Sequence, residues 1–304
     1  MPSVFAELAP VFILIAVGWI ARRARVASME AFGHVNRFGF FVLYPAFLFT
    51  LSSSADVSGR DAGPFVLGVL TGFVVMIVLA LALRPFFRDG PAYTSVFQGS
   101  VRWNGFVLLT AAPGLYGPLG PQLIGLAFGP LVLFVNAVCV VVLARWGEKR
   151  AASWRALLDQ IFANPLILSC LAGLTARAIG LHELGPLTDA LKLLGQAAMP
   201  VALVCVGAGL DFRALRASPA PVTVACVMKL AIAPLVMFFA AKLCGASPVA
   251  AAIAAGVGAT PTAAAGYTMA REMGGDAKLM AAIVTATTLA SFITMPIAIA
   301  LAGH

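Results

Sequence analysis

Residues 99–114 read GSVRWNGFVLLTAAPG, and residues 254–266 read AAGVGATPTAAAG. Both stretches lie inside long apolar segments, yet each one holds glycine and proline beside small polar residues. Proline removes a backbone donor and clashes with the preceding helical turn, and glycine leaves helical geometry at little cost. We therefore predict that each segment is a helix broken near its middle, at Asn104-Gly105 and at Thr260-Pro261. The alternative is that these residues only allow kinks and close helix packing.

The composition is typical of a membrane protein. Of the 304 residues, 61% are hydrophobic and only 11% are charged, whereas a soluble domain has about 25% charged residues. Apolar runs of about 18 or more residues read as membrane helices, which satisfy their own backbone hydrogen bonds in lipid. We predict an all-α integral membrane protein with ten transmembrane helices. These are expected over residues 4–21, 32–54, 62–83, 92–115, 120–144, 163–180, 187–210, 219–243, 247–270 and 277–301.

Basic residues are distributed unequally between the two sides of the predicted bundle. The connections after the first, third, fifth, seventh and ninth segments carry thirteen Lys and Arg residues, and the opposite side carries four. Because basic loops face the cytoplasm, we predict a cell inner-membrane protein with both termini outside, in the periplasm. This topology also accounts for the net charge of +8, so we expect no nucleic-acid partner. The thirteen are Arg22, Arg23, Arg25, Arg84, Arg88, Arg145, Lys149, Arg150, Arg155, Arg213, Arg216, Arg271 and Lys278.

An internal repeat divides the chain. Pro45 and Pro200 lie 155 residues apart, as do Asp56 and Asp211, and the two predicted breaks have nearly the same offset. This offset is five segments, an odd number, so the second copy is inserted upside down, as in the inverted repeats of many secondary transporters. Three parts are expected: a first five-helix repeat over 1–145, a cytoplasmic linker with a short amphipathic surface helix over 146–162, and an inverted five-helix repeat over 163–304.

The two breaks form the candidate substrate site. Half-helix N-termini present free N–H groups and the positive end of a dipole, which suit an anion. The residues expected to bind the substrate there are Asn104, Gly105, Thr260, Pro261 and Thr262. Asn136, in the 120–144 segment, is expected either to join them or to hydrogen-bond between helices. Residues expected to break or hinge their helices are Pro45, Pro113, Pro200, Gly256 and Gly258.

Three cations lie in an apolar context. A charge at the bilayer centre costs roughly 3 kcal/mol on insertion scales, so it usually faces a cavity or a partner. Arg102 is expected to bind the anion or else to offset the C-terminal dipole of a half-helix. Lys229 is expected to act as a substrate or coupling charge or else to brace the scaffold. Arg37 is expected to snorkel or to brace the fold.

The sequence lacks the signatures of several other functional classes. No Asp or Glu lies near the middle of a predicted segment, which argues against an antiporter that needs buried carboxylates. The Walker A, HExxH and GxSxG patterns are absent, so we expect no enzyme, no bound cofactor and no metal. The five cysteines include no CxxC pair and are expected to serve as small packing residues.

Five short motifs, taken in order, resemble the auxin efflux carrier family, whose bacterial members include malonate- and malate-type permeases. They are Leu43-Tyr44-Pro45-Ala46, Arg102-Trp103-Asn104-Gly105, Asn164-Pro165, Met199-Pro200 and Thr260-Pro261-Thr262. The resemblance covers nearly the whole chain and implies a scaffold domain of the first, second, sixth and seventh segments and a transport domain of the others. It also implies that the fourth and ninth segments cross at their breaks, with a carboxylate substrate beside the crossing. Asn104-Gly105 stands where plant members commonly have a proline break, and the long central loop of many plant carriers is missing.

We therefore predict a secondary transporter that moves a small organic anion by alternating access, a mono- or dicarboxylate such as malonate or malate. The alternatives are a cation- or proton-coupled antiporter of the same architecture and a non-transporting membrane scaffold. The sequence leaves open the substrate, the direction of transport and whether H⁺ or Na⁺ is the coupling ion. It also leaves open whether the chain forms a homodimer.

Overall fold

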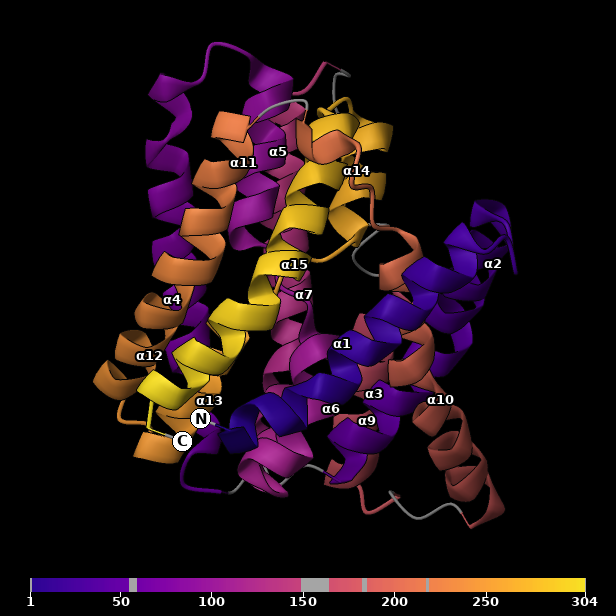
Figure 1. Ribbon diagram of the computed structural model, residues 1–304. Helices are drawn as coiled ribbons and strands as arrows, with labels where there is room; N and C mark the ends of the chain where they lie inside the picture. Colours follow the sequence, from indigo (N-terminus) through magenta and orange to yellow (C-terminus); the bar gives the residue numbers. More distant parts are fainter. Residues whose placement is uncertain (1, 55–58, 149–163, 182–184, 217–218, 304) are drawn as a thin grey trace.

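The computed structural model describes residues 2–54, 59–148, 164–181, 185–216 and 219–303. These residues form helices and no β-strand (Figure 1). Seven helical stretches among them are long and apolar enough to cross a membrane. The prediction of an all-helical membrane protein is therefore confirmed, and the arrangement of ten spans in two inverted repeats stays a prediction.

The helices follow one another with few long connections. In chain order they are α1 (Pro2–Arg23), α2 (Met29–Phe38), the π-helix η1 (Gly39–Leu43), α3 (Tyr44–Ser54), α4 (Ala62–Ala82), the 3₁₀-helix η2 (Arg84–Phe86), α5 (Gly90–Val101), α6 (Gly105–Tyr116), α7 (Leu119–Trp146), α9 (Pro165–Ala178), α10 (Pro186–Ala208), the 3₁₀-helix η3 (Ala214–Arg216), α11 (Pro219–Cys226), the π-helix η4 (Val227–Ile232), α12 (Ala233–Leu243), α13 (Pro248–Ala259), α14 (Ala265–Met273) and α15 (Ala277–Leu301).

Three of the ten predicted segments differ from a simple long helix. The seven candidate spans are Val4–Arg23, Met29–Ser54, Ala62–Phe86, Leu119–Trp146, Pro186–Ala208, Pro219–Leu243 and Ala277–Leu301. The sixth predicted segment contains α9, a helix of 14 residues. The fourth and ninth segments each consist of two short helices, α5 with α6 and α13 with α14.

The helices pack in two groups (Figure 1). In the first group, α10 packs against α1, α2 and α3, and α3 packs against α9. In the second group, α12 packs against α4 and α13, while α15 packs against α5, α11 and α13. Helices α6 and α7 contact both groups. The first group comes from the segments that the resemblance assigns to a scaffold domain.

The predicted proline hinges lie within continuous helices. Pro113 is inside α6 and Pro200 is inside α10. Pro45 is the second residue of α3, which follows η1 without a gap. Membrane helices tolerate proline because neighbouring groups and local adjustments satisfy the freed backbone atoms. The chain therefore remains helical through all three prolines, and a hinge at any of them stays a prediction.

Parts of the predicted linker and repeat cannot be compared with the structure. Residues 149–163, which include most of the linker and its surface helix, lie outside the described residues, and so does Asp56. The linker's first residues differ slightly from the expectation, because α7 continues to Trp146. After it, the Glu148 N–H donates to the Gly274 carbonyl at 2.8 Å.

Helices α1 and α10 touch backbone to backbone. A Cβ on Gly207 would overlap the carbonyl oxygen of Ile15, and one on Gly18 would overlap the carbonyl oxygen of Val204. Small residues at such contacts let membrane helices approach closely. This pair of glycines holds together two spans of the first helix group.

The Gly207→Ala variant is expected to lower the melting temperature in detergent. The added methyl group has no room, and overpacking of this kind costs about 1–3 kcal/mol. A matched control is Gly63→Ala in α4, because a Cβ at that position meets no atom within 4 Å. Equal melting temperatures for the two variants would contradict the close contact between α1 and α10.

Candidate functional site

The two helix breaks meet each other. Backbone in extended geometry follows α5 at Arg102 and follows α13 at Thr260. The Asn104 N–H donates to the Pro261 carbonyl at 2.9 Å, which joins one extended piece to the other. Four short helices therefore end or begin around a single crossing.

Threonine side chains brace this crossing from within. The Thr262 hydroxyl donates to the Gly99 carbonyl at 2.6 Å, and the Thr262 N–H donates to the Thr287 hydroxyl oxygen at 3.2 Å. The Thr260 hydroxyl donates to the Val257 carbonyl at 2.8 Å. Both Thr260 and Thr262 are buried. Their hydroxyl groups satisfy buried carbonyls near the ends of α5 and α13, where the regular helical hydrogen bonds stop.

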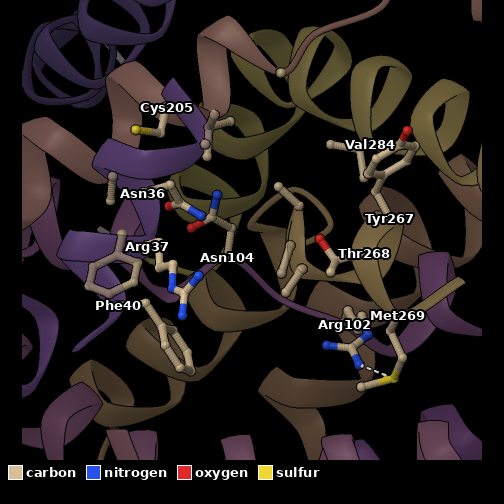
Figure 2. Close-up of a pocket in the computed structure, with 18 of the residues that line it drawn as sticks. Asn36, Arg37, Phe40, Arg102, Asn104, Cys205, Tyr267, Thr268, Met269 and Val284 are labelled. Atoms are coloured by element: carbon tan, nitrogen blue, oxygen red, sulfur yellow. Dashed lines mark hydrogen bonds between the residues drawn. The ribbon is translucent and has the colours of Figure 1, made fainter. Parts of the chain in front are cut away.

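A cavity of about 1290 Å³ lies beside the crossing (Figure 2). Four of the predicted substrate residues line it, namely Arg102, Asn104, Gly105 and Asn136. The other four, Lys229, Thr260, Pro261 and Thr262, are not among its lining residues. In the described part of the chain, no group of three or more His, Cys, Asp or Glu is placed to hold a metal ion.

Two helix N-termini on the cavity wall lack side-chain caps. Asn104 precedes α6 and Ala264 precedes α14, and neither side chain accepts a hydrogen bond from its helix. By contrast, Asp89 caps α5 and Ser247 caps α13 with side-chain oxygens. The residues around both uncapped ends line the cavity. The Val107, Gly266 and Tyr267 N–H groups donate to carbonyls of their own first turns. The first residues of both helices, Gly105 and Ala265, and the positive ends of two helix dipoles lie on the cavity wall, an arrangement that favours an anion.

Each half-helix that ends at the crossing has a cation near its last turn. The Arg102 Nε donates to the Gln98 Oε1 at 3.1 Å in α5, and Arg102 Nη2 lies 3.0 Å from the Met269 Sδ. Lys229 is 1% exposed, and its Nζ donates to the Gly258 carbonyl at 2.7 Å in the last turn of α13. These cations offset the negative ends of the two half-helices. Arg102 also reaches the cavity, so the two roles expected for it are compatible.

The predicted helix-breaking glycines lie just before the second break. Gly256 and Gly258 are buried inside α13, which ends one residue after Gly258. A Cβ on Gly258 would lie 2.6 Å from the Ala233 carbonyl oxygen of α12. This close approach brings α13 next to the segment that carries Lys229.

Sequence reasoning missed the α2–α3 side of the cavity. Arg37 was expected to snorkel or to brace the fold, and it lines the cavity together with Asn36 and Tyr44. The Tyr44 hydroxyl donates to the Asn36 Oδ1 at 3.1 Å, and the Tyr44 ring lies 4.7 Å from that of Phe106 in α6. The available signal was a polar pair, Asn36-Arg37, near the start of a largely apolar segment. Helical periodicity could not orient it, because the π-helix η1 shifts the register after it.

Comparison with known proteins defines the class to which this fold and site belong. The sequence pattern of a family described as "Membrane transport protein" matches residues 148–299, which is half of the chain. The chain belongs to this family, that of the auxin efflux carriers, and is an integral membrane protein. The resemblance drawn from the five motifs is confirmed.

Two relatives match nearly the full length of the chain. A protein of Rhizobium meliloti named "Putative malonate transporter" is 29% identical over 311 residues, which cover 97% of this chain and 94% of that protein. A protein of Methanothermobacter thermautotrophicus named "Uncharacterized transporter" is 24% identical over 291 residues, which cover 94% of each chain. The chain is thus similar to transporters from a bacterium and an archaeon.

Proposed function

We propose that the protein is a secondary transporter that moves a small organic anion, a mono- or dicarboxylate such as malonate or malate, across the inner membrane. In this proposal the chain has ten spans in two inverted repeats and works by alternating access. The name of the Rhizobium relative supports malonate as the first substrate to test. In this proposal a gradient of H⁺ or Na⁺ drives the transport.

One observation carries the proposal: two uncapped helix N-termini and the Arg102 side chain meet at one cavity. A carboxylate there accepts hydrogen bonds from backbone N–H groups near Asn104 and Ala264 and from the Arg102 guanidinium. Such charge-assisted bonds are roughly twice as strong as neutral ones. In this proposal, four residues outside the cavity lining stabilise the crossing: Thr260, Pro261, Thr262 and Lys229.

We further propose that this conformation is open to the cytoplasm. The cavity extends from the crossing to Arg22, Asp211 and Arg271. These residues lie in or beside the connections after the first, seventh and ninth segments, which belong to the basic, cytoplasmic side. A shift of the second helix group against the first would then expose the crossing to the periplasm.

Uptake of labelled malonate and malate into proteoliposomes tests the function. We expect saturable uptake above that of protein-free liposomes. Replacing Na⁺ by choline, and adding a protonophore, separates sodium coupling from proton coupling. Absence of flux over a panel of mono- and dicarboxylates would contradict anion transport and would favour a scaffold or a carrier of other solutes.

A further inference from the structure

A second arginine on the cavity wall has no role in the site proposed above. Arg37 belongs to α2 in the first helix group, whereas Arg102 lies at the break between α5 and α6. Both line the same cavity, and Figure 2 shows them with Asn104 among the side chains of its wall. Arg37 is exposed and lines this space, while Arg102 is 4% exposed. The cavity therefore offers an anion two guanidinium groups from separate parts of the fold.

Arg37 is less engaged with the protein than the other arginines of the wall. The Arg22 Nη2 donates to the Leu210 carbonyl at 2.7 Å, and Arg271 also has a partner within the protein. The Arg37 guanidinium carbon lies 6.0 Å from the centre of the Phe41 ring, at the limit of a cation–π contact. Over the ranges that the structure describes, Arg37 makes no ion pair. Its hydrogen-bond donors are available to a ligand.

The π-helix η1 sets the direction of this part of the wall. In a regular helix the residue seven positions before Tyr44, which is Arg37, would lie over the Tyr44 ring, because two turns take about seven residues. The wider π turn brings Asn36 there instead, where it accepts the Tyr44 hydroxyl at 3.1 Å. A Cβ on Gly39 would lie 2.7 Å from the Tyr44 ring, so glycine makes this arrangement possible. Asn36 therefore contacts the Tyr44 hydroxyl in place of Arg37, and the Arg37 side chain lines the cavity.

The contact between Tyr44 and Phe106 brings the two sides of the cavity together. Phe106 is the second residue of α6, next to the uncapped N-terminus, and its ring lies 4.7 Å from that of Tyr44. The continuous helical stretch Met29–Ser54, which carries Arg37 in α2 and Tyr44 in α3, is therefore packed against the start of α6. Arg37 is placed on the same wall, about two turns from Tyr44 along its helix.

We propose that Arg37 binds the second carboxylate of a short dicarboxylate whose first carboxylate is held at Asn104 and Arg102, and that it thereby sets the preference for dicarboxylates. The inference rests on the proposed function. A guanidinium presents a planar pair of donors that matches a carboxylate. A dianion can pair with both arginines, whereas a monoanion can pair with one of them. A site built to pair a polar group discriminates strongly against analogues that lack it.

The test compares labelled malonate with labelled propionate, which has the same number of carbon atoms and one carboxylate. Uptake kinetics are measured in proteoliposomes for the wild type, Arg37→Gln, Arg37→Lys and Arg23→Gln. We expect Arg37→Gln to raise the KM for malonate at least about tenfold and to change that for propionate less than about twofold. Arg37→Lys keeps the charge and should recover part of the malonate affinity. Arg23→Gln removes the same charge from an exposed position outside the cavity and should change neither value.

Four results would overturn the inference. An unchanged KM for malonate in Arg37→Gln would show that Arg37 does not contact the substrate. An equal loss of both substrates in Arg37→Gln, at an unchanged melting temperature, would show a general rather than a selective role. Transport of propionate in preference to malonate by the wild type would leave the proposed function intact and reject the second carboxylate subsite. Transport of neither substrate, nor of any other acid in the panel of mono- and dicarboxylates, would reject the proposed function itself, and the inference with it.

Discussion

Replacing Arg102 by glutamine is expected to raise the half-saturating concentration of malonate at least about thirtyfold. Arg102 is 4% exposed, lines the cavity and lies at the break that precedes α6. Truncating one partner of a buried charge pair costs about 2–5 kcal/mol, and each 1.4 kcal/mol is about tenfold in affinity. The protein partners of Arg102 are the neutral side chains of Gln98 and Met269, and such contacts stabilise the fold less than an ion pair would. The glutamine variant should therefore lose more malonate affinity than stability. The measurement is concentration-dependent uptake in proteoliposomes.

The control for this prediction is Arg23→Gln, which makes the same change of net charge. Arg23 is exposed at the end of α1, where its guanidinium lies 5.5 Å from the centre of the Trp19 ring, and it does not line the cavity. The uptake kinetics of the Arg23→Gln variant should equal those of the wild type. Equal effects of the two substitutions would mean that Arg102 acts only through the overall field of the protein, not as an anion ligand.

Replacing Lys229 by methionine is expected to lower malonate uptake about tenfold or more while the protein stays folded. Two effects on stability oppose each other. The Gly258 carbonyl loses its 2.7 Å partner, which costs about 1–3 kcal/mol. Removing a buried charge relieves an insertion cost of about 3 kcal/mol. Methionine fills a similar volume, so the melting temperature should change little.

Transport is more sensitive than stability to this substitution, because the charge at the crossing changes. Without the ammonium group, the negative end of α13 faces the region where the anion binds, and a loss of about 1.4 kcal/mol is tenfold in affinity. Lys242→Met is the matched control, because Lys242 is exposed on α12 and lies 5.4 Å from the Phe238 ring centre. A Lys229→Met protein with wild-type uptake would reject this electrostatic role.

The sequence predicted the features that depend on local chemistry. Glycine, proline and asparagine indicated where two apolar segments would be interrupted, and the structure places extended backbone at Arg102 and at Thr260. Hydropathy predicted the seven candidate spans because apolar length is itself the signal. The order of short motifs predicted the family, which the match over residues 148–299 confirms.

Hydropathy and the motifs do not show which residues face the cavity. Hydropathy gives the depth of Lys229 and Arg37 in the membrane, but it does not tell which way either side chain points. The π-helices η1 and η4 add to this difficulty, because a wider turn rotates all later residues relative to the earlier ones. The contact of Thr262 with Gly99 joins residues 163 positions apart, so only the folded chain reveals that this hydroxyl already has a partner.

Binding of malonate to the purified protein in detergent, measured by isothermal titration calorimetry, tests the proposed anion site at the crossing most directly. The comparison is between the wild type, Asn104→Asp and Gln122→Glu. Asn104→Asp places a negative charge at the N-terminus of α6 on the cavity wall, whereas Gln122→Glu adds the same charge to α7 away from the cavity. The proposed site predicts saturable binding that survives in Gln122→Glu and is lost in Asn104→Asp. Absence of binding to the wild type, or equal binding to Asn104→Asp, would contradict it.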